Sequence, residues 1–370
     1  MSRSISMEAS LGSYRVVRKL GQGGMAEVFL VRRKVPGTEQ WAQAQELALK
    51  RIRPELADNP EYSEMLLEEA RLGAALHHPN LVEAYDVGNH EGQLFFTMEL
   101  VRGPELRHIV REAAQSEGRL SLAHAIAIVL GVAAGLHHAH EMHTMDGMPL
   151  RIVHLDVCPS NVLVNDEGYV KLIDFGIAKT DRTAFLRLLA DGSWAGPIPQ
   201  QVDDALRRGT MAYMSPEQCV GNGLDRRSDV FSLGVILWEL TVWARLFRAP
   251  SQSEVFDRIV YHDATAPRSI VPDYPPGLEA IVMKALARDP AKRFQTALQL
   301  REALEDFAFS QGLHASPVRL SQLMRKLFPA KPPAEPPAEP PAESDDNADA
   351  LARRYQSIGT RWRSRNGSAE

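Results

Sequence analysis

The chain has 370 residues, of which 24% are charged and 44% hydrophobic, and its formal net charge is −5. This length and apolar content suffice for one large or two smaller folded domains. The weakly acidic charge gives no electrostatic basis for binding nucleic acid or an anionic membrane surface, so neither is expected as a partner. Two cysteines, Cys158 and Cys219, cannot build a disulfide framework and suit a reducing compartment.

Neither the N-terminus nor an internal apolar run predicts membrane insertion. Residues 1–14 lack the apolar core of a signal peptide. The run 230–244, taken as the most apolar stretch, is too short to span a bilayer and contains Glu239. We therefore expect a soluble cytoplasmic protein.

The first predicted elements are strands around a glycine-rich turn. Residues 1–12 are expected to be a flexible N-terminus, and residues 13–101 to form strands with one helix. Strands at 14–17 and 28–31 lie on either side of the turn 21–24, GQGG. Glycines there let backbone N–H groups approach a phosphate without side-chain obstruction. A plain hairpin loop explains this turn equally well, although the second strand argues against a dinucleotide fold, where a helix follows.

The next strand, 47–52, aims Lys50 inward, and strands at 81–86 and 93–98 complete a small antiparallel sheet. A helix is predicted at 61–76 between them. A lysine in a strand is usually solvated, and so are glutamates on a helix face. One glutamate of the helix is nevertheless in a position to pair with Lys50, the candidates being Glu64, Glu68 and Glu69.

Helices dominate from Gly103 onward, beginning with an apolar core helix from Leu122 to near His143. Four histidines gather at its end: His137, His138, His140 and His143. Such a group raises the hypothesis of a metal site. Because no cluster of Cys, Asp or Glu accompanies the histidines at ligand spacing, a site without metal is the favoured interpretation.

The C-terminal part contains further helices and a change of composition. Helices are predicted at 225–241, 277–287 and 294–308. Residues 311–328 form a short amphipathic helical extension, which is expected to pack back on the preceding domain. Residues 332–343 repeat PPAE three times and are expected to be extended. The whole of 329–370 is predicted to be a disordered, Pro-rich and charged tail.

The most informative stretch is 154–176, HLDVCPSNVLVNDEGYVKLIDFG. It predicts a loop, a strand at 161–164, a tight turn at 166–168 and a second strand at 169–173. A β-hairpin of this kind brings three polar side chains to one wall, namely Asp156, Asn161 and Asp174.

These three side chains suit phosphoryl transfer. The carboxamide of Asn161 and the carboxylate of Asp174 offer oxygen ligands, which a hard cation such as Mg²⁺ prefers. The carboxylate of Asp156 is left to orient an incoming hydroxyl group and to accept its proton. Phosphoryl transfer needs little more than such positioning and charge stabilisation, so the stretch predicts a kinase.

The complete set of motifs resembles the eukaryotic-type protein kinases, in particular the bacterial serine/threonine branch. The motifs follow the family's order between Tyr14 and about Phe309: GQGGMAEV, LALK, EEARLGAALHHPNLV, HLDVCPSN, DFG, GTMAYMSPE, SDVFSLGVILWEL and RDPAKRFQ. The resemblance implies an α+β, two-lobed protein kinase fold over residues 13–310. Its N-lobe (13–101) would hold the antiparallel β-sheet with one helix, and its C-lobe (102–310) would be mainly helical.

The resemblance also implies ATP and Mg²⁺ as cofactors. Lys50 would hold the α- and β-phosphates and pair with Glu69. Asp156 would be the catalytic base, and Asn161 and Asp174 would bind Mg²⁺. The other implied nucleotide contacts are Gly21, Gln22, Gly23, Gly24, Met25 and Ala26 over the phosphates, Val28 and Ala48 against adenine, Met98 behind it, Glu99 and Val101 in the hinge, and Glu105 near the ribose.

Other motif residues would be scaffold. Glu217 would pair with Arg293, and Asp229 would bind the backbone of the catalytic loop. Thr210 occupies the position where the serine/threonine branch has a threonine near the catalytic carboxylate. The implied activity is transfer of the γ-phosphoryl group of ATP to protein serine and threonine hydroxyls.

Two residues depart from the family pattern. Leu155 replaces an arginine that commonly binds a phosphate on the activation loop, so we hypothesise that activity does not require loop phosphorylation. Cys158 replaces a lysine that neutralises charge on the transferred phosphoryl group. A neutral filler is the favoured interpretation of this cysteine over a reactive thiol. The two losses keep a pseudokinase scaffold as the alternative function, whereas the GTMAYMSPE segment argues against a small-molecule kinase.

The segment between Asp174 and Glu217 holds 42 residues, more than is typical of the family. Residues 180–208 are interpreted as an insertion that inhibits the enzyme or binds a regulatory partner. The C-terminal tail is a second candidate site for such a partner. Candidate phosphorylation sites in the insertion are Thr180, Thr183 and Ser193.

Overall fold

The computed structural model describes residues 10–33, 45–116, 118–144, 146–175, 210–221 and 223–329. Within these ranges, the residues up to Phe328 belong to one compact unit. The predictions for the insertion at 180–208, its phosphorylation sites and the tail from residue 330 concern residues outside the described ranges.

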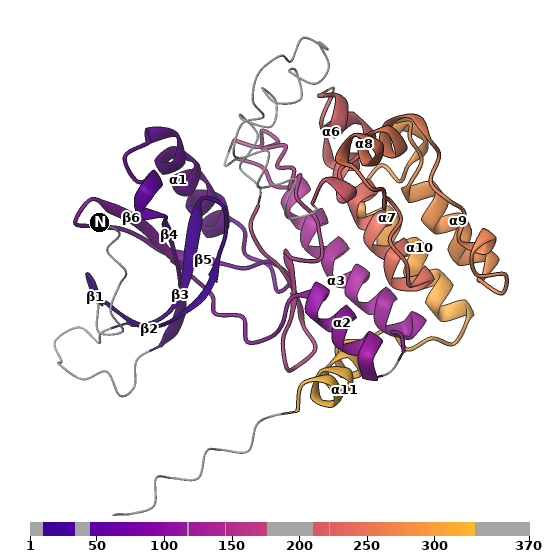
Figure 1. Cartoon of the computed structure of the whole chain (residues 1–370), viewed down its shortest axis with the longest axis horizontal. Helices are drawn as coiled ribbons and strands as arrows, with labels where there is room; N and C mark the ends of the chain where they lie inside the picture. The colour runs from indigo at the N-terminus through magenta and orange to yellow at the C-terminus, as the bar shows by residue number, and fades with distance from the viewer. Residues whose placement is uncertain are drawn as a thin grey trace, which may run out of the picture. The chain divides into compact units, whose positions relative to one another are not determined.

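The N-terminal part forms a six-stranded antiparallel sheet with the strand order β1-β2-β3-β4-β6-β5 (Figure 1). Helix α1 packs on β4, β5 and β6. It begins where the Asn59 side chain accepts a hydrogen bond from Glu61 N and Pro60 occupies the first turn. The elements are β1 Ser10–Leu11, β2 Tyr14–Gln22, β3 Ala26–Arg33, β4 Glu46–Ile52, α1 Pro60–Ala75, β5 Ala84–His90 and β6 Gln93–Met98.

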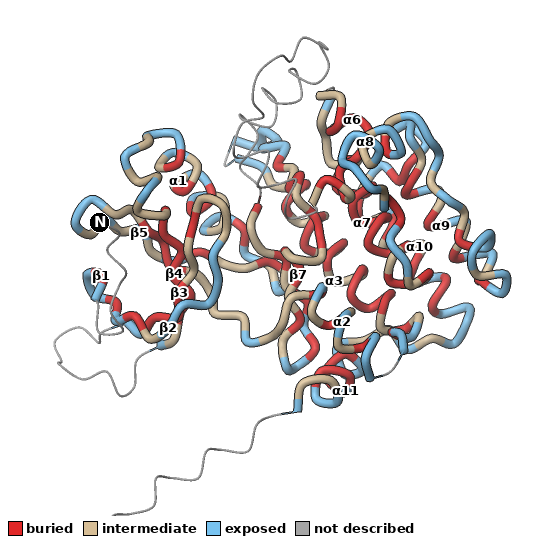
Figure 2. The backbone as a smooth tube through the Cα atoms, viewed as in Figure 1, coloured by how far each residue is buried: buried red, intermediate tan, exposed pale blue. Residues whose placement is uncertain are grey.

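The C-terminal part is mainly helical around α3 and α7. Helix α3 packs against α7, α10 and β8, and α7 also contacts α9 and α10. Figure 2 shows buried residues, in red, along these central helices. The elements are α2 Leu106–Ser116, α3 Leu122–His140, β7 Val162–Val164, β8 Val170–Leu172, α6 Pro216–Val220, α7 Arg226–Val242, α8 Gln252–Tyr261, α9 Pro276–Ala285, α10 Ala297–Ser310 and α11 Pro317–Leu327.

The most apolar helix is α3, not the run 230–244, so that expectation was wrong. Among the described residues, α3 is the one helix long and apolar enough to cross a membrane. Its most apolar window is 61% buried inside the protein, where it packs on α7 and α10. These contacts are those of a core helix.

The architecture confirms the predicted α+β organisation, with a small antiparallel sheet carrying one α-helix, followed by a larger helical part. Most predicted elements are present with shifted ends; β5, for example, spans Ala84–His90 instead of 81–86, a shift of three residues at its start and four at its end. Helices α2, α6 and α8 were not predicted individually. Helix α11 packs on α2 and α3, which confirms the expectation that the extension returns to the preceding domain.

Candidate active site

Lys50 lies at the centre of a cluster of charged side chains. It stands on β4, opposite Val28 of β3 and Phe96 of β6, and is 6% exposed. Its Nζ atom donates to Glu69 Oε1 at 2.5 Å and to Asp174 Oδ1 at 2.8 Å. The packing of α1 on the sheet therefore selects Glu69 from the three candidate glutamates.

Burial and charge act in opposite directions in this cluster. Burial alone would lower the pKa of Lys50, but the carboxylates of Asp174 and Glu69 raise it above its ordinary value. Burial raises the pKa of Glu69 to about 7, the Lys50 ammonium opposes this shift, and the negative charge of Asp174 adds to it. Burial would also raise the pKa of Asp174, yet the Lys50 ammonium lowers it. Lys50 and Asp174 are therefore the firmly charged members of the cluster.

Asn161 forms several hydrogen bonds within the loop 154–161, called the catalytic loop below. Its Nδ2 group donates to the backbone oxygen of Asp156 at 2.8 Å and to Asp156 Oδ2 at 3.0 Å. Its backbone N–H donates to Cys158 O, and its carbonyl oxygen accepts from Ile173 N, both at 2.9 Å. The carboxylate of Asp156 is thereby held beside Asn161. The backbone of Asn161 is bonded in turn to Ile173, the residue before Asp174.

Asp229 on α7 accepts hydrogen bonds from the backbone of this loop. It is 0% exposed, and its two oxygens accept from His154 N and Leu155 N, each at 2.8 Å. His140 Nε2 lies 2.8 Å from Asp229 Oδ2. Burial would raise the pKa of Asp229, but the hydrogen bond with His140 lowers it, so the carboxylate is charged. This geometry confirms the scaffold role predicted for Asp229.

The ring of His154 connects the loop to the strand that follows. Its Nδ1 atom accepts from Asp156 N at 3.2 Å, so Nε2 carries the hydrogen and donates to Ile173 O at 3.0 Å. Burial lowers the pKa of His154 and keeps the ring neutral. One neutral histidine thus bridges the segments that end in Asp156 and Asp174.

Two non-glycine residues of the site have left-handed backbone, Leu155 with φ 62° and Asp174 with φ 55°. Such a conformation costs roughly 1–2 kcal/mol for a residue with a side chain. Leu155 is held in it from both sides, because its N–H donates to Asp229 and its carbonyl accepts from Gln218 Nε2 at 2.9 Å. The role of Gln218 was not predicted, since 63 residues separate it from Leu155.

The remaining predicted site residues lie along the sheet and its exit. Gly21 and Gln22 end β2, Gly23 N donates to Ala26 O at 2.8 Å across the turn, and Ala48 pairs with Met98. After β6, the Glu99 carboxylate lies 2.7 Å from Lys171 Nζ on β8. The last implied contacts, Gly24, Met25, Val28, Val101 and Glu105, lie in the turn, on β3 and on the segment before α2. The nucleotide roles of these residues stay predictions.

Two of the four histidines at the end of α3 contact other side chains. His140 contacts Asp229, and His138 stacks on His78 with ring centroids 5.0 Å apart. In the part of the chain that the structure describes, no group of three or more His, Cys, Asp and Glu side chains is arranged to hold a metal ion.

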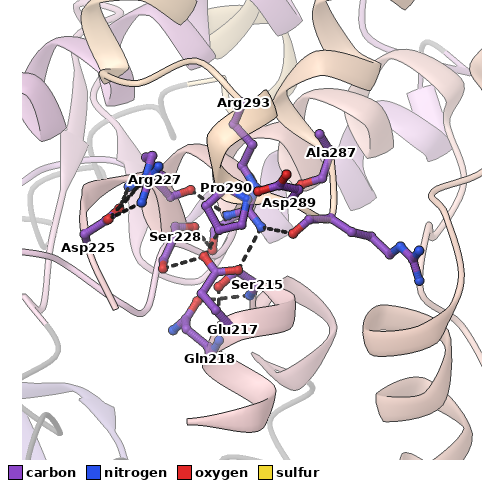
Figure 3. Close-up of polar contacts among 12 residues, drawn as sticks. Ser215, Glu217, Gln218, Asp225, Arg227, Ser228, Ala287, Asp289, Pro290 and Arg293 are labelled. Carbon is purple, nitrogen blue, oxygen red and sulfur yellow. Dashed lines mark hydrogen bonds and ion pairs between the residues drawn. The ribbon is translucent and has the colours of Figure 1, made fainter. Parts of the chain in front are cut away.

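The Arg293 guanidinium is buried in a polar network that includes Glu217 of α6 (Figure 3). It forms two parallel hydrogen bonds with the carboxylate of Glu217, both 2.7 Å long. Three backbone carbonyl groups accept its other bonds, those of Ala287, Arg227 and Arg288. The predicted pairing of Glu217 with Arg293 is confirmed. It fixes α6 to the segment before α10.

The chain belongs to the protein kinase family, since residues 14–305 match the model of the protein kinase domain. It is 37% identical over 296 residues to the tyrosine-protein kinase MasK of Myxococcus xanthus, covering 80% of this chain and 43% of MasK. It is 35% identical over 295 residues to the serine/threonine-protein kinase PknB of Mycolicibacterium smegmatis, covering 79% and 42%. The chain thus spans about two fifths of the length of these relatives.

A solved structure supports the fold. The crystal structure of the PknI kinase domain of Mycobacterium tuberculosis is similar with a TM-score of 0.56 and 26% identity, covering 82% of this chain and 99% of that one. The predicted two-lobed protein kinase fold and the predicted similarity to the bacterial serine/threonine branch of the family are confirmed.

Membership of the family implies the use of ATP and Mg²⁺. The side chains present fit such a cation. Because Asn161 Nδ2 is bound to two oxygens of Asp156, the Oδ1 atom is the one presented to a ligand. Asp174 supplies charged carboxylate oxygens from the adjoining segment, and a carboxamide with a carboxylate is a suitable partial ligand set for Mg²⁺.

Proposed function

We propose that this chain is an active serine/threonine protein kinase that transfers the γ-phosphoryl group of Mg-ATP to hydroxyl groups of protein substrates in a signalling pathway. The observation that carries the proposal is the contact of the buried Lys50 ammonium with both Glu69 and Asp174. This contact brings Lys50, a cation suited to bind phosphate, next to Asp174, a carboxylate suited to bind the metal ion. Phosphoryl transfer requires both groups close together.

Each residue then has a defined task. Lys50, oriented by Glu69, holds phosphate oxygens of the nucleotide. Asn161 and Asp174 would hold Mg²⁺, which supplies charge neutralisation to the phosphates when bound. Asp156, whose carboxylate is oriented by the Asn161 amide, accepts the proton from the substrate hydroxyl.

Three proteins test this proposal, namely the wild type, Asp156→Asn and Lys50→Met, each incubated with a protein substrate and labelled ATP. We expect labelling in the wild type and a loss of at least about 10²-fold in both variants. Equal labelling of the three proteins would refute it.

The alternative is a weakly active or inactive pseudokinase that acts as a nucleotide-binding scaffold. One observation favours it, because Cys158 packs into the hydrophobic core at the position where the family has a lysine. Nucleotide binding by a wild type that transfers no label would establish this alternative.

The proposal includes independence from activation-loop phosphorylation. Leu155 has an apolar side chain that is 3% exposed, and its backbone is held by the Asp229 carboxylate and the Gln218 carboxamide. Position 155 therefore offers no positive charge that a phosphate on the activation loop would have to neutralise. Phosphatase treatment, followed by mass spectrometry to confirm removal of phosphate, should leave the rate unchanged. A large loss of activity would contradict this part of the proposal.

The hydroxyl specificity rests on the similarity to PknB, while MasK carries the name of a tyrosine kinase. Phosphoamino-acid analysis of labelled substrate distinguishes the two, and we expect phosphoserine and phosphothreonine. We further propose that the domain acts in the cytoplasm, where its nucleotide is supplied, which fractionation of cells producing the tagged protein tests.

A further inference from the structure

Helix α11 lies outside the match to the family model, which ends at residue 305, yet it is built into the core. Its residues Leu320, Leu323 and Met324 are buried in the main hydrophobic cluster. They occupy i, i+3 and i+4, one face of the helix, and that face packs on α2 and α3 (Figure 1).

The first turns of α11 contact the turn of the β7–β8 hairpin. Ser321 Oγ donates to Asp166 O at 2.7 Å. At Gly168, where φ is +85°, a Cβ atom would lie 1.9 Å from Pro317 O and 2.6 Å from Ser321 N. Both neighbours are backbone atoms of the helix, so the turn and α11 approach each other as closely as a glycine permits.

The opposite end of the same hairpin holds the two side chains that suit Mg²⁺. Asn161 directly precedes β7, Asp174 follows β8 by two residues, and Ile173 N donates to Asn161 O at 2.9 Å. The strands have three residues each, which makes the hairpin about 10 Å long. An isolated hairpin of this size has little stability of its own, so its orientation depends on what packs against it.

We propose that α11 is a positioning element for metal binding: by contacting the turn at Asp166 and Gly168, it fixes the hairpin that presents Asn161 and Asp174 to Mg²⁺. This inference rests on the proposed function. A displacement of about 1 Å at a catalytic group is enough to cost about 10²-fold in rate. Because the hairpin is short, a shift of its turn at the contact with α11 would also shift Asn161 and Asp174 at its other end.

Two substitutions disturb the contact to different degrees. Gly168→Ala forces a methyl group into backbone atoms that need about 3.4 Å of separation, so the turn or α11 must move by more than an ångström. Ser321→Ala removes one hydrogen bond and is expected to leave the fold intact. The matched control is Gly92→Ala, because Gly92 also lies in a β-hairpin turn with φ +80° but has no atom within 4 Å of the added Cβ.

The experiment measures ADP binding by calorimetry over a series of Mg²⁺ concentrations. The wild type should bind ADP more tightly as Mg²⁺ rises. We expect Gly168→Ala to need about 10-fold more Mg²⁺ for the same gain and Ser321→Ala about 5-fold more, with ADP affinity in the absence of Mg²⁺ unchanged. The Gly92→Ala control should follow the wild type, even though it carries the same backbone strain.

The outcomes separate this inference from the proposed function. If wild-type binding does not depend on Mg²⁺, the proposed metal site itself is wrong. If the wild type depends on Mg²⁺ and both variants match Gly92→Ala, only the positioning role of α11 is overturned. Should Gly168→Ala fail to fold, Ser321→Ala decides the question alone.

Discussion

The buried pair of Glu217 and Arg293 permits a quantitative prediction for Glu217→Gln. The Arg293 side chain is 0% exposed, and its guanidinium is bound by the Glu217 carboxylate and three carbonyl groups. Glutamine keeps the shape of the side chain but removes its negative charge. The guanidinium then stays buried without a counter-ion, a change that costs about 3–5 kcal/mol in unfolding free energy.

A matched surface pair provides the control. Arg301 and Glu305 lie 2.8 Å apart on α10, with side chains 40% and 45% exposed. Glu305→Gln removes the same kind of charge at nearly the same distance, but in solvent, and should cost about 0.3–0.5 kcal/mol. The roughly tenfold difference in cost reflects the burial of the Glu217–Arg293 pair together with its second parallel hydrogen bond.

Urea unfolding followed by circular dichroism measures both variants. A double variant, Glu217→Gln with Arg293→Met, should lose less stability than the sum of the two single variants, because no uncompensated guanidinium remains. The reasoning is refuted if Glu217→Gln costs no more than Glu305→Gln.

Three further predictions concern pH, the cysteine and a close backbone approach. Burial holds the pKa of His154 below 6.5, so its contribution to stability is fully present above pH 6.5 and is lost as the pH falls towards the folded pKa. Burial would raise the pKa of Glu217, but Arg293 lowers it below 4.5, so a second contribution to stability is lost as the pH falls below 4.5. Melting temperatures measured across this pH range should show both losses of stability. The loss that begins at pH 6.5 should be smaller in His154→Gln. Cys158→Lys should lower the melting temperature and give no gain in rate, because the side chain enters the core; a faster, equally stable enzyme would contradict this. Gly103→Ala places a Cβ atom 1.9 Å from Val164 O and should cost at least about 1–3 kcal/mol in a urea titration, whereas an unchanged midpoint would show that the segment adapts.

The sequence alone predicted the family, most of the strands and the longer helices in their order, and the type of chemistry that the motifs imply. Each motif is a short contiguous run whose residue types suffice for its task, such as glycines in a turn or Asp156 and Asn161 five residues apart. Hydrophobic periodicity located the long helices, because the alternation of faces is a local property of the backbone. Element ends were less accurate, since capping and tertiary contacts decide them.

The family resemblance had already implied that Lys50 meets Glu69 and that Glu217 meets Arg293; the residue pattern by itself named no distant pair, and the tertiary structure decided these contacts. The residues by themselves left Glu64, Glu68 and Glu69 as equal partners for Lys50; the packing of α1 buries only Glu69 and leaves the other two exposed. The contact of His140 with Asp229 joins positions 89 residues apart, and that of Ser321 with Asp166 joins positions 155 apart. Such pairs depend on how whole elements pack, a property that no local pattern carries, and they hold the catalytic loop and its hairpin in place.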